Sequence, residues 1–195
     1  MIRRHHAIVL AFVVPTLAAS LGCSDDEKAT PQVIFEGEIK GNAADCAGAA
    51  PLFSVGSFGN LAANPPVAAS PVPDGSAFSQ GAASISCSVV PAGNNEFTVA
   101  ASVVLSGATG GLFRVDGPFK TGSEQTDIHA IFSTVASGNK YEQLDRKCRV
   151  RYATTFQGVA SGRVWGEITC PNAVNVNADK TCEVTARFRF ENCDQ

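Results

Sequence analysis

Hydrophobic and polar residues alternate with a period of two along most of the chain after residue 31, which is the pattern of β-strands that bury one face. The alternation is clearest in the last third, over residues 148–156, 163–170 and 182–190. There the even positions are apolar or cysteine: Val150, Tyr152, Phe156, Val164, Ile168, Val184, Phe188 and Phe190. Many odd positions carry charges, so we predict antiparallel sheet with one dry and one solvated face.

The same period appears upstream of these segments. In residues 33–40, Val33, Phe35, Gly37 and Ile39 form the expected buried face. The turn signal Pro91–Asn95 between two apolar runs predicts a hairpin. Further strands are expected at residues 84–89, 97–105, 112–115 and 127–135. With about eight short strands and no long amphipathic helix, the pattern predicts an all-β fold, a single antiparallel β-sandwich or jelly-roll-like domain over residues 32–195.

Residues 41–83 break this pattern. They are rich in Ala, Gly, Ser and Pro, and Asp45 and Asp74 are their only charged residues. Asn64-Pro65-Pro66 and Pro71–Gly75 are turn signals that interrupt helices and long strands. We expect a covering loop pinned by Cys46, with a short strand at residues 52–58; the alternative is a docking segment for a partner.

The first residues read as a secretory signal peptide. Arg3 and Arg4 precede a mainly apolar run from Ala7 to Ala19, and small residues lead to Cys23. An apolar run of this length is short for a membrane span and typical of a signal-peptide core. We assign residues 1–22 to the signal peptide.

The stretch Ser20-Leu21-Gly22-Cys23 resembles the lipobox of bacterial lipoproteins, with Ser20 and Leu21 in exchanged order relative to the family pattern. The resemblance implies that Cys23 is acylated, for example with palmitate, and becomes the mature N-terminus. It also implies a lipid-anchored protein of the bacterial cell envelope, facing the periplasm or the cell surface. Residues 23–31 would then be a charged tether. The alternatives are cleavage after Ser20, which leaves Cys23 as an odd thiol, and an uncleaved anchor.

The chain holds seven cysteines, and six remain if Cys23 is acylated. An even number in an exported chain predicts three disulfides, whereas zinc sites need closer spacings than these, so we expect no metal. Cys182 and Cys193 would lie about 36 Å apart on one straight strand and cannot pair there. Cys148 with Cys170 is the favoured local bridge, and Cys170 with Cys182 is its alternative. The predicted disulfide cysteines are Cys46, Cys87, Cys148, Cys170, Cys182 and Cys193.

Composition and charge narrow the class of protein. With 45% hydrophobic and 17% charged residues, the chain is too apolar to be disordered throughout. Loss of Arg3 and Arg4 leaves 13 basic against 18 acidic residues, a mature net charge of −5. This balance argues against nucleic acid as a partner.

No catalytic motif emerges, and no cofactor is expected. His129, the only histidine after the signal peptide, shares a strand face with Asp127, so the two side chains could share a ligand. The sequence nominates neither further metal ligands nor a partner nucleophile, which favours a surface or hydrogen-bonded histidine over a ligand or general base. The glycine-rich stretches at residues 56–59 and 106–111 match neither a nucleophile elbow nor a phosphate loop. Glu167 and Glu183 are the only carboxylates we nominate as a glycosidase pair.

The charged face of the last strands offers one candidate ligand surface. Its arginines can fork-bind phosphate or carboxylate, and its indole can stack on a sugar ring. The alternative is a solvated face in which Glu167, Glu183 and Glu191 pair with the arginines. Trp165 could equally lie under a loop. The candidate residues are Arg149, Arg151, Arg163, Trp165, Arg187 and Arg189.

Together these features predict a non-enzymatic envelope lipoprotein with a structural or binding role. Its partners would be the membrane, through the anchor, and an anionic glycan, a lipid headgroup or an envelope protein. The alternatives are an envelope glycan hydrolase and a partner-binding assembly subunit that docks through residues 41–83.

Overall fold

The computed structural model describes residues 28–41, 46, 51–78, 81–122, 124–177 and 179–195. The expected signal peptide, residues 1–22, and Cys23 lie outside them. In the described part the chain forms β-strands and no helix, and therefore no helix that could cross a membrane. The strands are β1 (Gln32–Lys40), β2 (Pro51–Val55), β3 (Val72–Pro73), β4 (Ala77–Phe78), β5 (Gly81–Gly93), β6 (Glu96–Leu105), β7 (Gly111–Lys120), β8 (Gln125–Thr134), β9 (Lys140–Glu142), β10 (Cys148–Arg151), β11 (Gly158–Ala160), β12 (Arg163–Asn175) and β13 (Lys180–Glu191).

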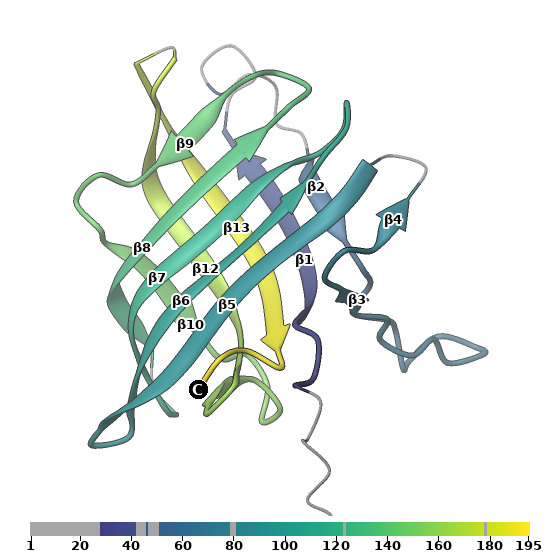
Figure 1. Ribbon diagram of the computed structural model, residues 1–195. Helices are drawn as coiled ribbons and strands as arrows, with labels where there is room; N and C mark the ends of the chain where they lie inside the picture. The colour runs from purple at the N-terminus through teal and green to yellow at the C-terminus, as the bar shows by residue number, and fades with distance from the viewer. Residues whose placement is uncertain (1–27, 42–45, 47–50, 79–80, 123, 178) are drawn as a thin grey trace, which may run out of the picture.

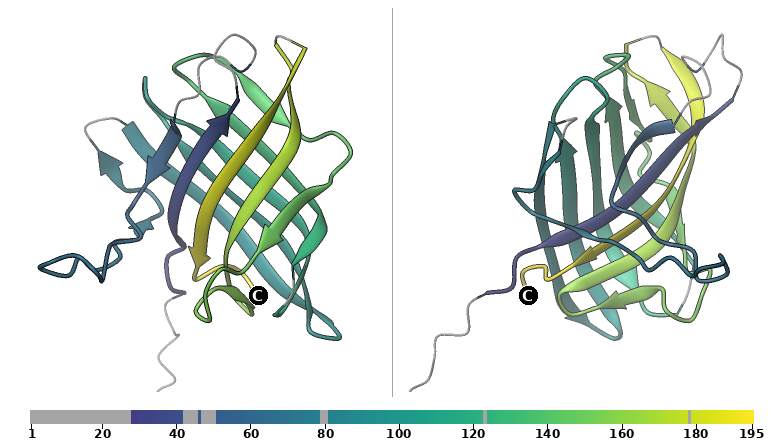
Figure 2. Two further views of the ribbon diagram at one scale, coloured as in Figure 1. Left: turned by 180° about the vertical axis from the view of Figure 1, so that it is seen from behind. Right: turned by 90° about the vertical axis from the view of Figure 1, so that its right-hand side faces the viewer.

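All named strands belong to one antiparallel arrangement. Ten of them follow the order β2-β1-β13-β12-β10-β8-β7-β6-β5-β4, while β3 pairs with β1, β9 with β8 and β12, and β11 with β12. The strands β5 to β8 form one layer, and β1, β13 and β12 form the other (Figures 1 and 2). β10 joins them, because it pairs with β8 on one side and β12 on the other. The predicted all-β, disulfide-linked antiparallel fold is confirmed.

The core between the layers is an aromatic cluster centred on Phe113 of β7. Its ring lies 4.5 Å from that of Phe35, 5.2 Å from Phe132 and 5.5 Å from Phe188, measured between centroids. These residues come from both layers and are fully buried. The alternation of the sequence places them on inward faces, so burial of their rings holds the layers together.

The outcome differs from the alternating pattern at three places. Ile34, which alternates with the buried set of residues 33–40, is itself fully buried, because Gly56 of the loop after β2 packs over its side chain. Phe156, expected on the dry face, is 75% exposed, because β10 ends at Arg151 and the chain then leaves the sheet. Residues 158–160, which lie between the alternating segments 148–156 and 163–170, form the strand β11 against β12.

The three predicted disulfides are present. Cys148 pairs with Cys170 across β10 and β12, as favoured from the spacing, which excludes the Cys170–Cys182 bridge. Cys46 pairs with Cys182 of β13. Cys87 of β5 pairs with Cys193 just after β13, so this bridge joins the two layers.

The segment expected as a covering loop also closes the gap between β1 and β5. β3 pairs with β1 and β4 with β5. Between them, the Asp74 N–H donates to the Pro31 carbonyl at 2.8 Å, and the Asp74 carboxylate accepts from the Ile85 N–H at 2.6 Å. The end of this segment therefore connects the two layers.

Candidate functional site

The outward face of β10, β12, β13 and β1 carries a cross-strand row of four charged side chains with alternating sign. Strand register sets each one beside the next, and the alternation of each strand points all of them away from the core. The row consists of Arg151, Glu167, Arg187 and Glu36. Glu36 of β1 is the one member of this row that the sequence did not nominate. The charged residues at alternate positions of residues 36–40 were the signal that could have found it.

The arginines of this row are already paired with carboxylates. Arg151 donates from Nε and Nη2 to Glu167 Oε2 at 2.9 and 2.7 Å. Arg187 Nη2 lies 2.5 Å from Glu36 Oε2. The side chains of Arg151 and Arg187 are half or more exposed, so each pair contributes well under about 1 kcal/mol. Paired arginines agree with the solvated-face alternative, although Glu183 pairs with Lys40.

An open groove of about 340 Å³ lies along this row, and a second hollow of about 230 Å³ continues it. Thr169 and Thr185 face each other in register and belong to both. Their short side chains stand beside long charged ones, which makes the depression. We call the two together the threonine groove. Its charged residues are Lys40, Arg149, Arg151, Arg187, Glu36, Glu38, Glu124, Glu167 and Glu183.

The threonine groove is nearly charge-balanced, with four basic and five acidic side chains. Every arginine in it faces at least one carboxylate; the loosest pair is Arg149 with Glu124, at 4.0 Å. An anion would meet repulsion from the carboxylates as well as attraction to the arginines. Guanidinium, carboxylate and hydroxyl groups side by side instead offer both donors and acceptors to a polar, uncharged ligand.

Three of the six nominated ligand residues lie outside the groove. Trp165 is half-buried under the loop after β2, with its ring 6.2 Å from that of Phe58. Arg189 stacks on Trp165 at 5.1 Å and donates to Glu191 at 2.7 Å. Arg163 is exposed, and it makes no ion pair within the described residues. Only Arg149, Arg151 and Arg187 are therefore brought together.

The nominated glycosidase pair is not assembled. Glu167 lies opposite Arg187, four positions along β13 from Glu183. At about 3.3 Å per residue this offset alone is about 13 Å, beyond the separation that glycosidase carboxylates use.

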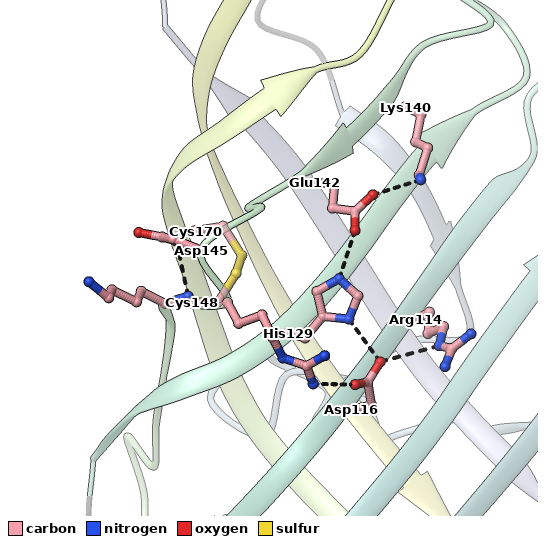
Figure 3. Close-up of polar contacts among 10 residues, drawn as sticks. Arg114, Asp116, His129, Lys140, Glu142, Asp145, Cys148 and Cys170 are labelled. Atoms are coloured by element: carbon pink, nitrogen blue, oxygen red, sulfur yellow. Dashed lines mark hydrogen bonds and ion pairs between the residues drawn. A yellow bond between two sulfur atoms is a disulfide. The ribbon is translucent and has the colours of Figure 1, made fainter.

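On the outside of the other layer, His129 of β8 lies between two carboxylates (Figure 3). Its Nδ1 is 3.0 Å from Asp116 of β7, and its Nε2 is 2.9 Å from Glu142 of β9. Sequence reasoning placed Asp127 beside His129 and missed both partners, because each lies 13 positions away and only strand register brings them close.

Basic side chains surround this cluster. Arg146 and Arg114 lie 2.7 and 3.3 Å from Asp116, and Lys140 lies 2.7 Å from Glu142. Burial raises the pKa of Asp116, but hydrogen bonds and charge from His129 and Arg146 outweigh it, so the net pKa lies below 3.8. Hydrogen bonds from Lys140 and then His129 hold the pKa of Glu142 below 4.5.

The cluster links strands and presents no catalytic arrangement. Both ring nitrogens of His129 are engaged by separate carboxylates, which prevents a common metal from binding all three side chains. Among the described residues, no group of three His, Cys, Asp or Glu side chains could hold a metal ion. We therefore assign the His129 cluster to the stability of β7, β8 and β9.

Replacement of Asp116 by asparagine is expected to lower the free energy of unfolding by about 1–3 kcal/mol at pH 7, because it removes charged hydrogen bonds to His129 and Arg146. The folded-state pKa of Asp116 is depressed, so its contribution is present above the ordinary value of 3.8 and is lost as pH falls through the folded value. Urea unfolding of the parent and of Asp116→Asn at pH values from 7 into the acid range should show that the difference between their free energies of unfolding shrinks.

Asp127→Asn is the matched control, since Asp127 is exposed on β8, the strand of His129, beside the β7 strand that carries Asp116. It should change the free energy of unfolding by less than about 0.5 kcal/mol. A difference for Asp116→Asn that persists unchanged into strong acid would contradict the assignment.

No protein-family model matches the chain, and no curated protein or solved structure is significantly similar to it.

Proposed function

We propose that the protein is an exported, lipid-anchored domain of the bacterial cell envelope with a non-enzymatic binding role, and that its threonine groove binds a polar envelope glycan. The signal peptide and the lipobox-like Ser20–Cys23 motivate export and anchoring. Three disulfides within one domain support an oxidising compartment. The composition of the groove is the observation that carries the binding role.

The groove suits a glycan because both hydrogen-bond donors and hydrogen-bond acceptors lie along it. Arg151 and Glu167 stand side by side, and Thr169 follows Glu167 on the same outward face of β12. Sugar hydroxyls both donate and accept, so neighbouring carboxylates and guanidinium groups can each bind one. The near balance of charge favours an uncharged glycan over the anionic ligand expected from the arginines alone.

Retention on fractionated envelope polysaccharide tests this role. Replacing Arg149 and Arg151 together by alanine is expected to weaken retention about ten-fold, equivalent to about 1.4 kcal/mol, through lost hydrogen bonds. Both residues line the groove from β10. The measurement is co-sedimentation of the purified protein with each fraction.

Lys120→Ala provides the control, because Lys120 is an equally exposed base that pairs with Glu96 on the other layer. Its retention should equal that of the parent. Equal retention of all three proteins, or no retention of the parent by any fraction, would refute a glycan-binding groove.

A further inference from the structure

Residues 57–70, between β2 and β3, form a hairpin arm that projects from the body of the domain (Figures 1 and 2). Ser57 and Ser70 exchange backbone hydrogen bonds of 3.0 and 2.8 Å, and Asn60 and Val67 exchange bonds of 2.8 and 2.9 Å. The arm is therefore an ordered hairpin with its own backbone pairing.

Packing and close backbone contacts hold the base of the arm. Gly59 has φ +70°, and a Cβ there would lie 2.5 Å from the Val67 carbonyl oxygen, so glycine is what allows the two legs to approach. Phe58 stacks on Trp165, and the Arg187 guanidinium lies 4.7 Å from the centre of its ring. The base is thereby fixed on the outer face of β12 and β13.

The outer part of the arm is uncharged and apolar. Leu61 is 80% exposed and Val67 is 51% exposed, and Pro65 and Pro66 between them are exposed as well. No charged residue occurs from Gly56 to Pro73. An ordered, exposed and apolar projection of this kind indicates a contact surface.

The base of the arm lies beside the start of β1, which the tether from Cys23 precedes. Val72 and Pro73, directly after the arm, pair with Val33 and Gln32 at the start of β1. The carbonyl of Pro31 accepts from the Asp74 N–H, which keeps the end of the tether at this place. The eight residue-to-residue steps from Cys23 to Pro31 span at most about 29 Å, so an acylated Cys23 would hold the base of the arm within that distance of the bilayer.

A second exposed apolar side chain lies at the same end of the molecule. Phe156 stands in the loop before β11, and β11 pairs with the first residues of β12. Register through β13 places those residues level with the start of β1. This end of the domain therefore combines the tether, the arm and Phe156.

We propose that the tip of the arm, from Leu61 to Val67, lies in the interfacial layer of the membrane that holds the anchor. This inference rests on the proposed lipid anchor. The tether brings the arm to the lipid, and the uncharged tip can enter the headgroup and upper acyl region without burying a charge. Anchor and arm together would fix the orientation of the domain on the membrane.

The test uses the full acylated protein reconstituted into phosphatidylethanolamine and phosphatidylglycerol vesicles that contain lipids brominated high on the acyl chain. Trp165→Phe removes the native indole, and Leu61→Trp then places a single indole at the tip. We expect its emission to shift to shorter wavelength and to lose about half its intensity to bromine, since interfacial side chains lie about 5–10 Å below the headgroups.

Val135→Trp, in the same Trp165→Phe background, is the matched control. Val135 is 54% exposed in the turn after β8. This turn lies beside β9, which pairs with the last residues of β12, at the end of the domain opposite the tether. Its emission should be unaffected by the brominated lipid.

Flotation with the vesicles reports the anchor, and quenching reports the arm. Flotation with quenching confined to L61W supports the inference. Flotation without quenching of L61W, or with equal quenching of V135W, overturns it while leaving the anchor in place. Emission that is shifted but unquenched also overturns it, by assigning the tip to a contact with a second copy of this protein. A protein that does not float overturns the anchor, and the inference with it.

Discussion

Replacing Cys87 and Cys193 by alanine is expected to lower the free energy of unfolding by about 5 kcal/mol, because the bridge closes a long loop in the unfolded chain. The two cysteines are 106 positions apart, and they join β5 of one layer to the end of β13 in the other. The same model of loop-closure entropy gives only about 3.4 kcal/mol for Cys148–Cys170, whose cysteines are 22 positions apart.

Urea denaturation of both double variants, followed by the fluorescence of Trp165, measures this difference. The Cys148, Cys170 double-alanine variant is the control for loss of a bridge as such. In the folded state, Cys87 also lies beside the backbone hydrogen bonds that join β5 to Asp194. Loss of the Cys87–Cys193 bridge should therefore loosen the contact between β5 and Asp194. Equal losses for the two variants, or a greater loss for Cys148–Cys170, would contradict the structural ranking.

Phe113→Ala is expected to cost about 3–5 kcal/mol of unfolding free energy, the range for a large aromatic removed from a core. Phe113 is fully buried and packs against rings from β1, β8 and β13. The cavity would lie where the two layers meet, so few neighbours could move to fill it. Denaturation midpoints in urea measure the change.

Phe156→Ala is the control, because the same chemical change is made at a side chain that is 75% exposed. It should alter stability by less than about 0.5 kcal/mol. A small effect of Phe113→Ala would show that the two layers are not joined through this ring.

The substitution of Cys87 and Cys193 and the substitution of Phe113 both bear on function, because they weaken the packing that holds β1 in place. This strand supplies Phe35 to the core, Glu36 to the threonine groove and the pairing partners of β3 at the base of the arm. The disulfides and the aromatic core thus hold the elements that position the groove and the arm. Loss of binding in a core variant should accordingly follow loss of stability, whereas Arg149→Ala with Arg151→Ala should affect binding alone.

Local alternation in the sequence determined which faces are dry, because successive side chains of a strand point to opposite sides whatever lies around it. The even positions of β13 from Cys182 to Phe190 are buried, as predicted. The Cys148–Cys170 bridge was also predictable, since its cysteines lie on strands that are near neighbours along the chain. The all-β class follows from the same alternation, and the number of disulfides follows from the even count of cysteines left after Cys23.

Tertiary structure decided the contacts that depend on distant strands. His129 meets Asp116 and Glu142 only through the register of β7, β8 and β9, and Cys87 meets Cys193 only because the two layers close on each other. Ile34 and Trp165 leave the solvent because a loop crosses the charged face. A period of two specifies the side of a strand but not its neighbours or what covers it, so the groove and the arm required the folded chain.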